Sequence, residues 1–120
     1  MATRKNQNPT YNDWTKVKRI FRYLAGTTNF GILYSKDIND PNTLVGYSDS
    51  DFGNADDRKS TTGFVFCLNS SPISWISRKQ ASTATSTCVA EYFALCEATK
   101  EALYLRKVLQ NLIHHNPILQ

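Results

Sequence analysis

The sequence predicts an α/β fold with α+β character, in which a mixed sheet, largely antiparallel in its first part, is covered by one long helix. Three observations predict it: an amphipathic helical pattern opens the chain, four short apolar runs separated by turn residues follow, and a long helical pattern comes last. Of the 120 residues, 41% are hydrophobic and 20% are charged, which is typical of a folded domain and excludes a disordered chain.

The first predicted element is a helix from Asp13 to about Ala25, with Thr10, Asn12 and Asp13 as candidate N-terminal caps. An apolar stripe runs along it at helical spacing, formed by Trp14, Val17, Ile20, Phe21 and Leu24. Its cations lie mostly off that stripe, at Lys16, Lys18, Arg19 and Arg22. The pattern indicates either a docking helix with a solvated face or a helix that contacts nucleic-acid phosphates.

Four strands are expected next, at Phe30–Tyr34, Leu44–Ser48, Gly63–Leu68 and Pro72–Ser77. The turn-rich DINDPN separates the first two, and the link NSS joins the last two at hairpin spacing. The last element is a long helix from about Cys88 to Ile113, with Ser86 or Thr87 as its cap. One side of that helix is kept small, as in close packing against a sheet, by Ala90, Ala94 and Ala98.

The acidic residues are unevenly placed in a chain of net charge +4, because six of the ten fall between Asp37 and Asp57. Asp49 and Asp51 share one strand face if the second strand extends that far. Two such carboxylates repel each other unless a cation lies between them, and Mg²⁺ prefers oxygen ligands of this kind. A solvated turn rich in Asx residues explains the same composition. Glu91, early in the long helix, either interacts with the helix dipole or points at the sheet beside Asp49.

Several functional classes are excluded by the absence of their motifs. Zinc-site, P-loop and G-x-S-x-G patterns do not occur, and the acidic stretch does not fit an EF-hand loop. Three cysteines without C-x-x-C spacing favour reduced thiols in an intracellular protein, either cytoplasmic or nuclear. No apolar run reaches 18 residues and the N-terminal segment lacks the apolar core of a signal peptide, so we expect no membrane partner.

Four blocks of sequence, in order, resemble one known family. They are WTKVKRIFRYLAGTTNFGILY, GYSDSDFGNADDRKSTTGFVF, SWISRKQ and AEYFALCEATKEALYLRKVL. Together they resemble the end of the Pol polyprotein of copia-type LTR retrotransposons, where a connection segment leads into the ribonuclease H domain. The resemblance implies a basic connection helix at residues 1–28 and a ribonuclease H-like domain at 29–120. That fold has three antiparallel strands, a helix across the sheet, and then further strands and helices.

The resemblance also implies a chemistry, the two-metal hydrolysis of the RNA strand in an RNA–DNA hybrid. Asp49 matches the first-strand aspartate and Glu91 the helix glutamate, so both are expected as catalytic residues and Mg²⁺ ligands. Asp51 is a weaker candidate as a metal ligand. The expected contacts to nucleic-acid backbone are Lys16, Arg19, Arg22, Arg58 and Lys59.

Two departures from the family pattern limit the expected activity. The third catalytic aspartate of the family lies early in the strand after the long helix, whereas here NPILQ looks like the approach to that strand and the last acidic residue is Glu101. The segment from Cys88 to Tyr92 stands where the family usually has Thr-Glu-Ala-Glu-Tyr, which removes a capping residue and a carboxylate. We therefore expect weak or vestigial Mg²⁺ binding and little hydrolysis by a C-terminally truncated domain alone.

Three interpretations remain open on the sequence. The chain is an enzyme fragment completed by further sequence or another chain, a non-catalytic domesticated module, or a remnant without function. The module would bind nucleic acid, or a protein or ribonucleoprotein assembly that completes the open edge of the sheet.

Overall fold

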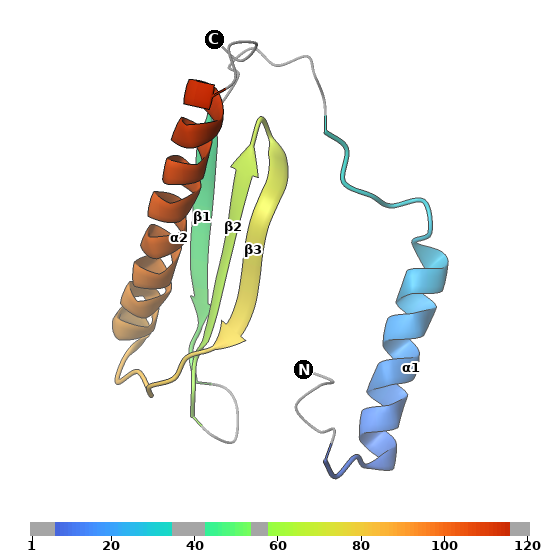
Figure 1. The fold of residues 1–120 in the computed structure, drawn as a ribbon. Helices are drawn as coiled ribbons and strands as arrows, with labels where there is room; N and C mark the ends of the chain where they lie inside the picture. Colours follow the sequence, from blue (N-terminus) through green and yellow to red (C-terminus); the bar gives the residue numbers. More distant parts are fainter. Residues whose placement is uncertain (1–6, 35–42, 54–57, 116–120) are drawn as a thin grey trace. The chain divides into compact units, whose positions relative to one another are not determined.

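The computed structural model describes residues 7–34, 43–53 and 58–115. Its elements in chain order are α1 (Tyr11–Gly26), β1 (Leu44–Asp51), β2 (Thr61–Leu68), β3 (Ser71–Lys79) and α2 (Thr87–His115) (Figure 1). The predicted fold class is confirmed, because an antiparallel sheet of three strands is combined with helices in the expected order. The chain divides into two compact units, Met1–Ile32 and Leu33–Gln120. The assignment of residues 1–28 and 29–120 as separate functional domains stays a prediction.

Helix α1 begins with a reciprocal capping arrangement. Thr10 is the N-cap: its hydroxyl oxygen accepts a hydrogen bond from the Asp13 backbone N–H at 3.3 Å, and Asp13 Oδ2 accepts one from the Thr10 N–H at 3.1 Å. Because Thr10 is the cap among the three predicted candidates, the helix starts at Tyr11, two residues earlier than expected. The helix buries none of its residues, so its apolar stripe is exposed surface.

The sheet has the order β1-β2-β3, with both pairings antiparallel. Asn69 and Ser70 alone connect β2 to β3, and both have positive φ angles, 54° and 62°. A two-residue loop of this conformation matches the right-handed twist of the strands that it joins. The expected hairpin is therefore confirmed, with longer strands and a shorter loop than the sequence predicted.

The strand predicted at Phe30–Tyr34 is wrong, because the structure has no strand in that segment. Its last two residues are held beside the β2–β3 turn by side-chain hydrogen bonds. Tyr34 Oη donates to the Pro72 carbonyl at 2.9 Å, and Ser71 Oγ donates to the Leu33 carbonyl at 2.8 Å. An apolar run without a ladder partner thus stays irregular. The strand expected to begin at NPILQ, residues 116–120, lies outside the described residues.

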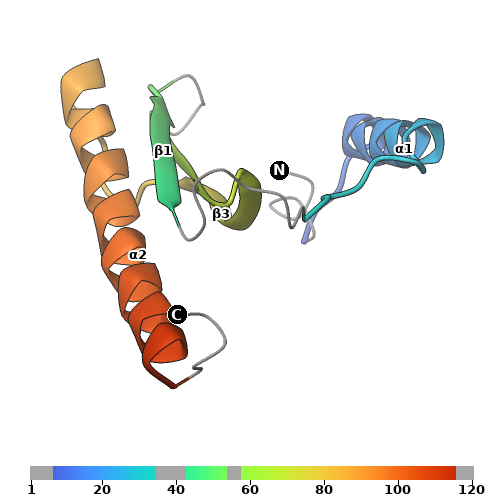
Figure 2. The same cartoon turned by 90° about the horizontal axis from the view of Figure 1, so that it is seen from above.

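Helix α2 covers one face of the sheet (Figure 2). Its small side packs inward as predicted: Ala90 and Ala94 are 0% exposed and Ala98 is 5% exposed. On the sheet, the Phe66 ring lies directly over Gly46, so close that any side chain at position 46 would collide with it. Ser86 is the cap among the two candidates, because its hydroxyl accepts the Val89 N–H at 3.2 Å.

Candidate functional site

The two aspartates expected at the site lie at the end of β1. The strand runs to Asp51, so the condition for Asp49 and Asp51 to share one face is met, and both residues are exposed. Asp49 pairs with Gly63 and Asp51 with Thr61 on β2.

Glu91 approaches this strand end from α2. Its Oε1 accepts a hydrogen bond from the Ser50 backbone N–H at 3.3 Å. Ser50 lies between the two aspartates, so the Glu91 carboxylate of the helix reaches the strand end, and its role as a ligand beside Asp49 stays a prediction. This contact joins residues 41 positions apart in the chain.

The three carboxylates do not project from the same face of the sheet. The groove under α2 is lined on β1 by Leu44, Gly46, Tyr47 and Ser48, and the hydroxyl of Ser50 is buried. Side chains alternate along a strand, so Asp49 and Asp51 project from the opposite face. Glu91 thus contacts the backbone of Ser50, the residue next to Asp49, whereas the Asp49 side chain projects from the other face of the sheet.

Hard carboxylate oxygens at one strand end are the donor type that suits Mg²⁺. Within 7–34, 43–53 and 58–115, no group of three or more His, Cys, Asp or Glu residues lies close enough to hold a metal ion. A site that fixes two ions about 4 Å apart needs more carboxylates than these described residues bring together. The roles of Asp49, Glu91 and Asp51 stay predictions.

Gln80 fixes the start of α2 relative to the sheet, and its role was not predicted from the sequence. Its Nε2 donates to Thr62 Oγ1 at 3.1 Å and to the Ala90 carbonyl at 2.9 Å, and its backbone N–H donates to the Ser60 carbonyl at 2.9 Å. Because Ala90 precedes Glu91, this buried amide also holds Glu91 against β1. The local sequence SWISRKQ gives no signal for this role, because the partners of the amide, Thr62 and Ala90, lie elsewhere in the chain.

Three polar side-chain atoms are buried without a hydrogen-bond partner among the described residues: Ser50 Oγ, Ser60 Oγ and Gln80 Oε1. Buried polar groups in folded proteins nearly always have a protein or water partner. Ordered water is the usual partner of such atoms.

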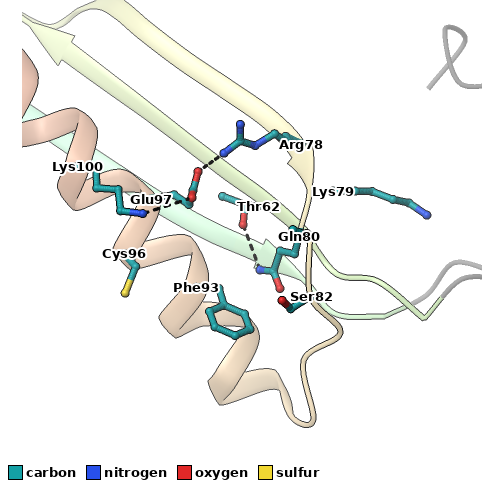
Figure 3. Close-up of a pocket in the computed structure, with 10 residues that line it drawn as sticks. Thr62, Arg78, Lys79, Gln80, Ser82, Phe93, Cys96, Glu97 and Lys100 are labelled. Atoms are coloured by element: carbon teal, nitrogen blue, oxygen red, sulfur yellow. Dashed lines mark hydrogen bonds and ion pairs between the residues drawn. The ribbon is translucent and has the colours of Figure 1, made fainter.

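Two further glutamates of α2 contact β3 through an ion pair and a hydrogen bond. Glu97 interacts with Arg78 of β3 and, at 3.9 Å, with Lys100 one turn along the helix, and Glu101 accepts a hydrogen bond from Ser74 Oγ at 2.7 Å (Figure 3). These carboxylates therefore have structural partners away from Asp49.

The cations expected to bind nucleic acid occur in both units. On α1, Lys16 pairs with Asp13 at 3.3 Å, whereas Arg19 and Arg22 are exposed. Arg58 and Lys59 precede β2, and Arg58 is exposed with a φ of 54°. Nucleic-acid binding by these residues stays a prediction.

The fold defines a small α/β domain with carboxylates near one strand end, and comparison with known proteins identifies its family. The chain is 41% identical over 116 residues to the retrovirus-related Pol polyprotein from transposon TNT 1-94 of Nicotiana tabacum, covering 96% of this chain and 8% of that polyprotein. It is 36% identical over 115 residues to the retrovirus-related Pol polyprotein from transposon RE2 of Arabidopsis thaliana, covering 92% and 8%.

A shorter relative is covered over most of its length. The secreted RxLR effector protein 161 of Plasmopara viticola is 41% identical over 99 residues, which are 82% of this chain and 68% of that protein. The chain belongs to the family of retrovirus-related Pol sequences from transposons, and it matches a segment of those polyproteins. No protein-family model and no solved structure matches it. Over the described residues, no helix has the length and apolarity needed to cross a membrane.

Proposed function

We propose that the chain is a copia-type ribonuclease H-like domain, whose ancestral activity is metal-dependent hydrolysis of the RNA strand in RNA–DNA hybrids. The observation that carries the proposal is the hydrogen bond from the Ser50 N–H to Glu91, because it brings the helix glutamate to the backbone between Asp49 and Asp51. Beyond family membership, the proposal assigns the chain to one domain of the polyprotein and to one reaction.

Asp49 and Glu91 hold one Mg²⁺ at the edge of β1 in this proposal, and Asp51 adds a further carboxylate nearby. The ion, when bound, supplies a Lewis acid that activates water next to a phosphodiester. Gln80 keeps Glu91 in place through the Ala90 carbonyl. Arg58 and Lys59 neutralise phosphates of the hybrid beside the strand end, and Lys16, Arg19 and Arg22 contribute further backbone contacts.

Hydrolysis by this chain alone is expected to be slow or undetectable. In-line displacement with two metal ions needs both ions held in fixed positions. The described residues contain no group of three or more ligands that could hold a metal ion, and each 1.36 kcal/mol lost in transition-state stabilisation lowers the rate tenfold. The Mg²⁺ site is accordingly weak or vestigial.

A cleavage assay tests the proposal. The chain is incubated with an end-labelled RNA–DNA hybrid and Mg²⁺ or Mn²⁺, beside Asp49→Asn and Glu91→Gln, with Glu101→Gln as the matched control. Glu101 is a carboxylate of the same helix, and glutamine keeps the acceptor that Ser74 needs. Slow, metal-dependent cleavage that both site variants remove and the control retains supports the proposal. Cleavage that survives Asp49→Asn rejects it.

A second candidate function is a non-catalytic module that binds nucleic acid or a ribonucleoprotein assembly. The absence of a group of three metal-ligating residues from the described part of the chain favours it. Such binding weakens steeply with salt and is unchanged by Asp49→Asn. We place either protein in the cytoplasm or nucleus, where the free thiols of Cys67, Cys88 and Cys96 stay reduced.

A further inference from the structure

One long edge of the sheet is open in the described part of the chain. Strand β1 is an outer strand in the order β1-β2-β3, and helix α2 lies over β1 and β2 (Figure 1). The backbone groups on the outer side of an edge strand can pair with another strand. The outer groups of β1 are therefore a potential docking site for an added strand.

Hydrogen bonds at the two ends of β1 show which of its residues face outward. The Thr43 carbonyl accepts from the Asn69 N–H at 3.4 Å, so the odd-numbered positions face β2. The Ser50 N–H instead donates to Glu91 of α2, so the even-numbered positions face outward. Backbone groups alternate in this way along an antiparallel strand. The remaining outward N–H groups, each with its carbonyl on the same side, belong to Leu44, Gly46 and Ser48.

These outward groups are complementary to a second copy of the same strand. Two antiparallel β1 strands centred on Gly46 would pair Gly46 with Gly46 and Leu44 with Ser48, so that each outward N–H meets a carbonyl. Ser50 stays outside this register and keeps its contact with α2. The aspartates at the end of β1 also lie outside it, so like charges do not face each other across the new pair.

The flank of α2 beside this edge is exposed as well. Together with β1 it lines a groove of about 290 Å³, to which the helix contributes Leu95, Ala98, Thr99 and Ala102. Leu95 is 55% exposed although it lies in this groove. Leu95, Thr99, Ala102 and Arg106 follow one another at steps of four, three and four residues, which is the spacing of a seam between two packed helices.

The distances between strands and between helices suit a second copy better than a lone peptide. Because α2 lies over both β1 and β2, its axis is set back from the edge by about half the strand spacing of about 4.8 Å. Twofold pairing of β1 then places the two α2 axes about 10 Å apart, close to the usual distance of packed helices. A single extended peptide would pair with β1 but leave the flank of α2 exposed.

Opposite charges also meet in this arrangement. Helix α2 runs antiparallel to β1, since Glu91 contacts Ser50 near the end of the strand and Ala102 lines the groove beside its start. Twofold pairing therefore sets the later turns of one α2 beside the first turns of the other. The exposed Arg106 then lies within about one turn of Glu91 of the second copy, and symmetry repeats this contact.

We propose that two copies of this chain associate through the outer edge of β1 and the adjoining flank of α2. The pairing joins the two three-stranded sheets into one continuous sheet, with both α2 helices on the same face. It satisfies the open backbone groups of β1, covers Leu95 and brings Arg106 to Glu91. The proposal goes beyond the hydrolysis of RNA–DNA hybrids and does not rest on it.

Analytical ultracentrifugation of the full chain over a range of concentrations measures the association, and amide hydrogen exchange locates it. The expected result is a dimer whose formation protects the amides of residues 44, 46 and 48. The outer edge of β3 is the internal reference. The Gln80 N–H donates to the Ser60 carbonyl, so even-numbered positions of β3 face β2 and Ser77 faces outward. Its amide should stay unprotected at every concentration.

Proline at position 48 tests the strand pairing. Ser48→Pro removes an outward N–H from each copy and leaves the bonds between β1 and β2 intact, so the dimer should weaken at least about tenfold. Ser77→Pro is the matched control, because it makes the same change at an exposed serine on the other edge of the sheet and should leave the dimer unchanged. The ¹H–¹⁵N spectra of both variants establish that they are folded.

Charge reversal on α2 tests the interface without altering the sheet. Arg106→Glu should weaken the dimer about threefold to tenfold, because it sets like charges together twice. Lys107→Glu makes the same change of net charge at the next exposed position, which turns away from the flank, and should have no effect. A chain that stays monomeric, a dimer that survives Ser48→Pro in its folded form, or equal effects of Arg106→Glu and Lys107→Glu would overturn the proposal. None of these variants changes Asp49 or Glu91, so failure here leaves the cleavage assay unaffected.

Discussion

Replacement of Gly46 by alanine tests the close packing of the sheet under α2. A Cβ at position 46 would lie 2.7 Å from Cδ1 and 2.9 Å from Cζ of Phe66. Carbon atoms in contact are normally about 3.5–4.0 Å apart, so the ring must move by roughly 1 Å. Phe66 is 5% exposed, so its ring is packed against neighbouring side chains on most sides. Overpacking of this kind costs about 1–3 kcal/mol.

The assay is urea unfolding followed through amide resonances of β1 and β2, which report the sheet and not α1. Gly46→Ala should lower the midpoint by about 1 M, given slopes of about 1–3 kcal/mol/M for small proteins. Gly63→Ala is the matched control in the same sheet, because its Cβ would meet only backbone oxygens at 3.8 and 3.9 Å. The control should change the midpoint little.

A double-mutant cycle identifies the contact responsible. In a Phe66→Leu background the ring atoms that collide with a new Cβ are absent, so Gly46→Ala should cost less than in the natural sequence. An equal cost in both backgrounds, or equal effects of Gly46→Ala and Gly63→Ala, would refute the packing argument.

Three further outcomes are expected. Gln80→Leu should destabilise the sheet unit by about 1–3 kcal/mol, measured by urea unfolding, because Thr62 Oγ1 loses its donor and the start of α2 loses its tie. Val89→Glu should stabilise α2 by about 0.5–1 kcal/mol, since a carboxylate three residues after Ser86 completes a capping box; an unchanged midpoint would contradict this. The hydrogen bonds from the Thr10 hydroxyl and backbone lower the pKa of Asp13 from 3.8 to about 2. A folded pKa below the unfolded value stabilises the helix start above pH 3.8, and this stabilisation is lost as the pH falls toward 2. NMR titration of the Asp13 carboxyl group should give that value, and an ordinary pKa would exclude the capping box.

The long elements were predictable because their patterns are local. Ala90, Ala94 and Ala98 mark the packed side of α2 in the sequence alone, and the structure buries them as expected. The antiparallel hairpin was likewise predictable from two apolar runs separated by a short polar link. The segment Phe30–Tyr34 has the composition of a strand, but strand formation depends on a partner distant in sequence.

The candidate site was only partly predictable for a related reason. Asp49 and Glu91 stood out as carboxylates in sequence, and the structure joins their elements through the Ser50 N–H. The face from which each carboxylate projects depends on how β1 packs beneath α2. This packing is a tertiary contact and cannot be read from the sequence alone. The role of Gln80 depends on Thr62 and Ala90, which lie elsewhere in the chain, and no local sequence pattern predicts such a contact.

Manganese titration followed by paramagnetic broadening of amide resonances tests the central claim most directly. If Asp49 and Glu91 hold one divalent ion at the edge of β1, the amides of residues 49–51 and 91 broaden first. Asp49→Asn and Glu91→Gln each then weaken the site by at least about tenfold, and Glu101→Gln has no effect. Broadening centred elsewhere, or an affinity unchanged by Asp49→Asn and Glu91→Gln, would contradict the account.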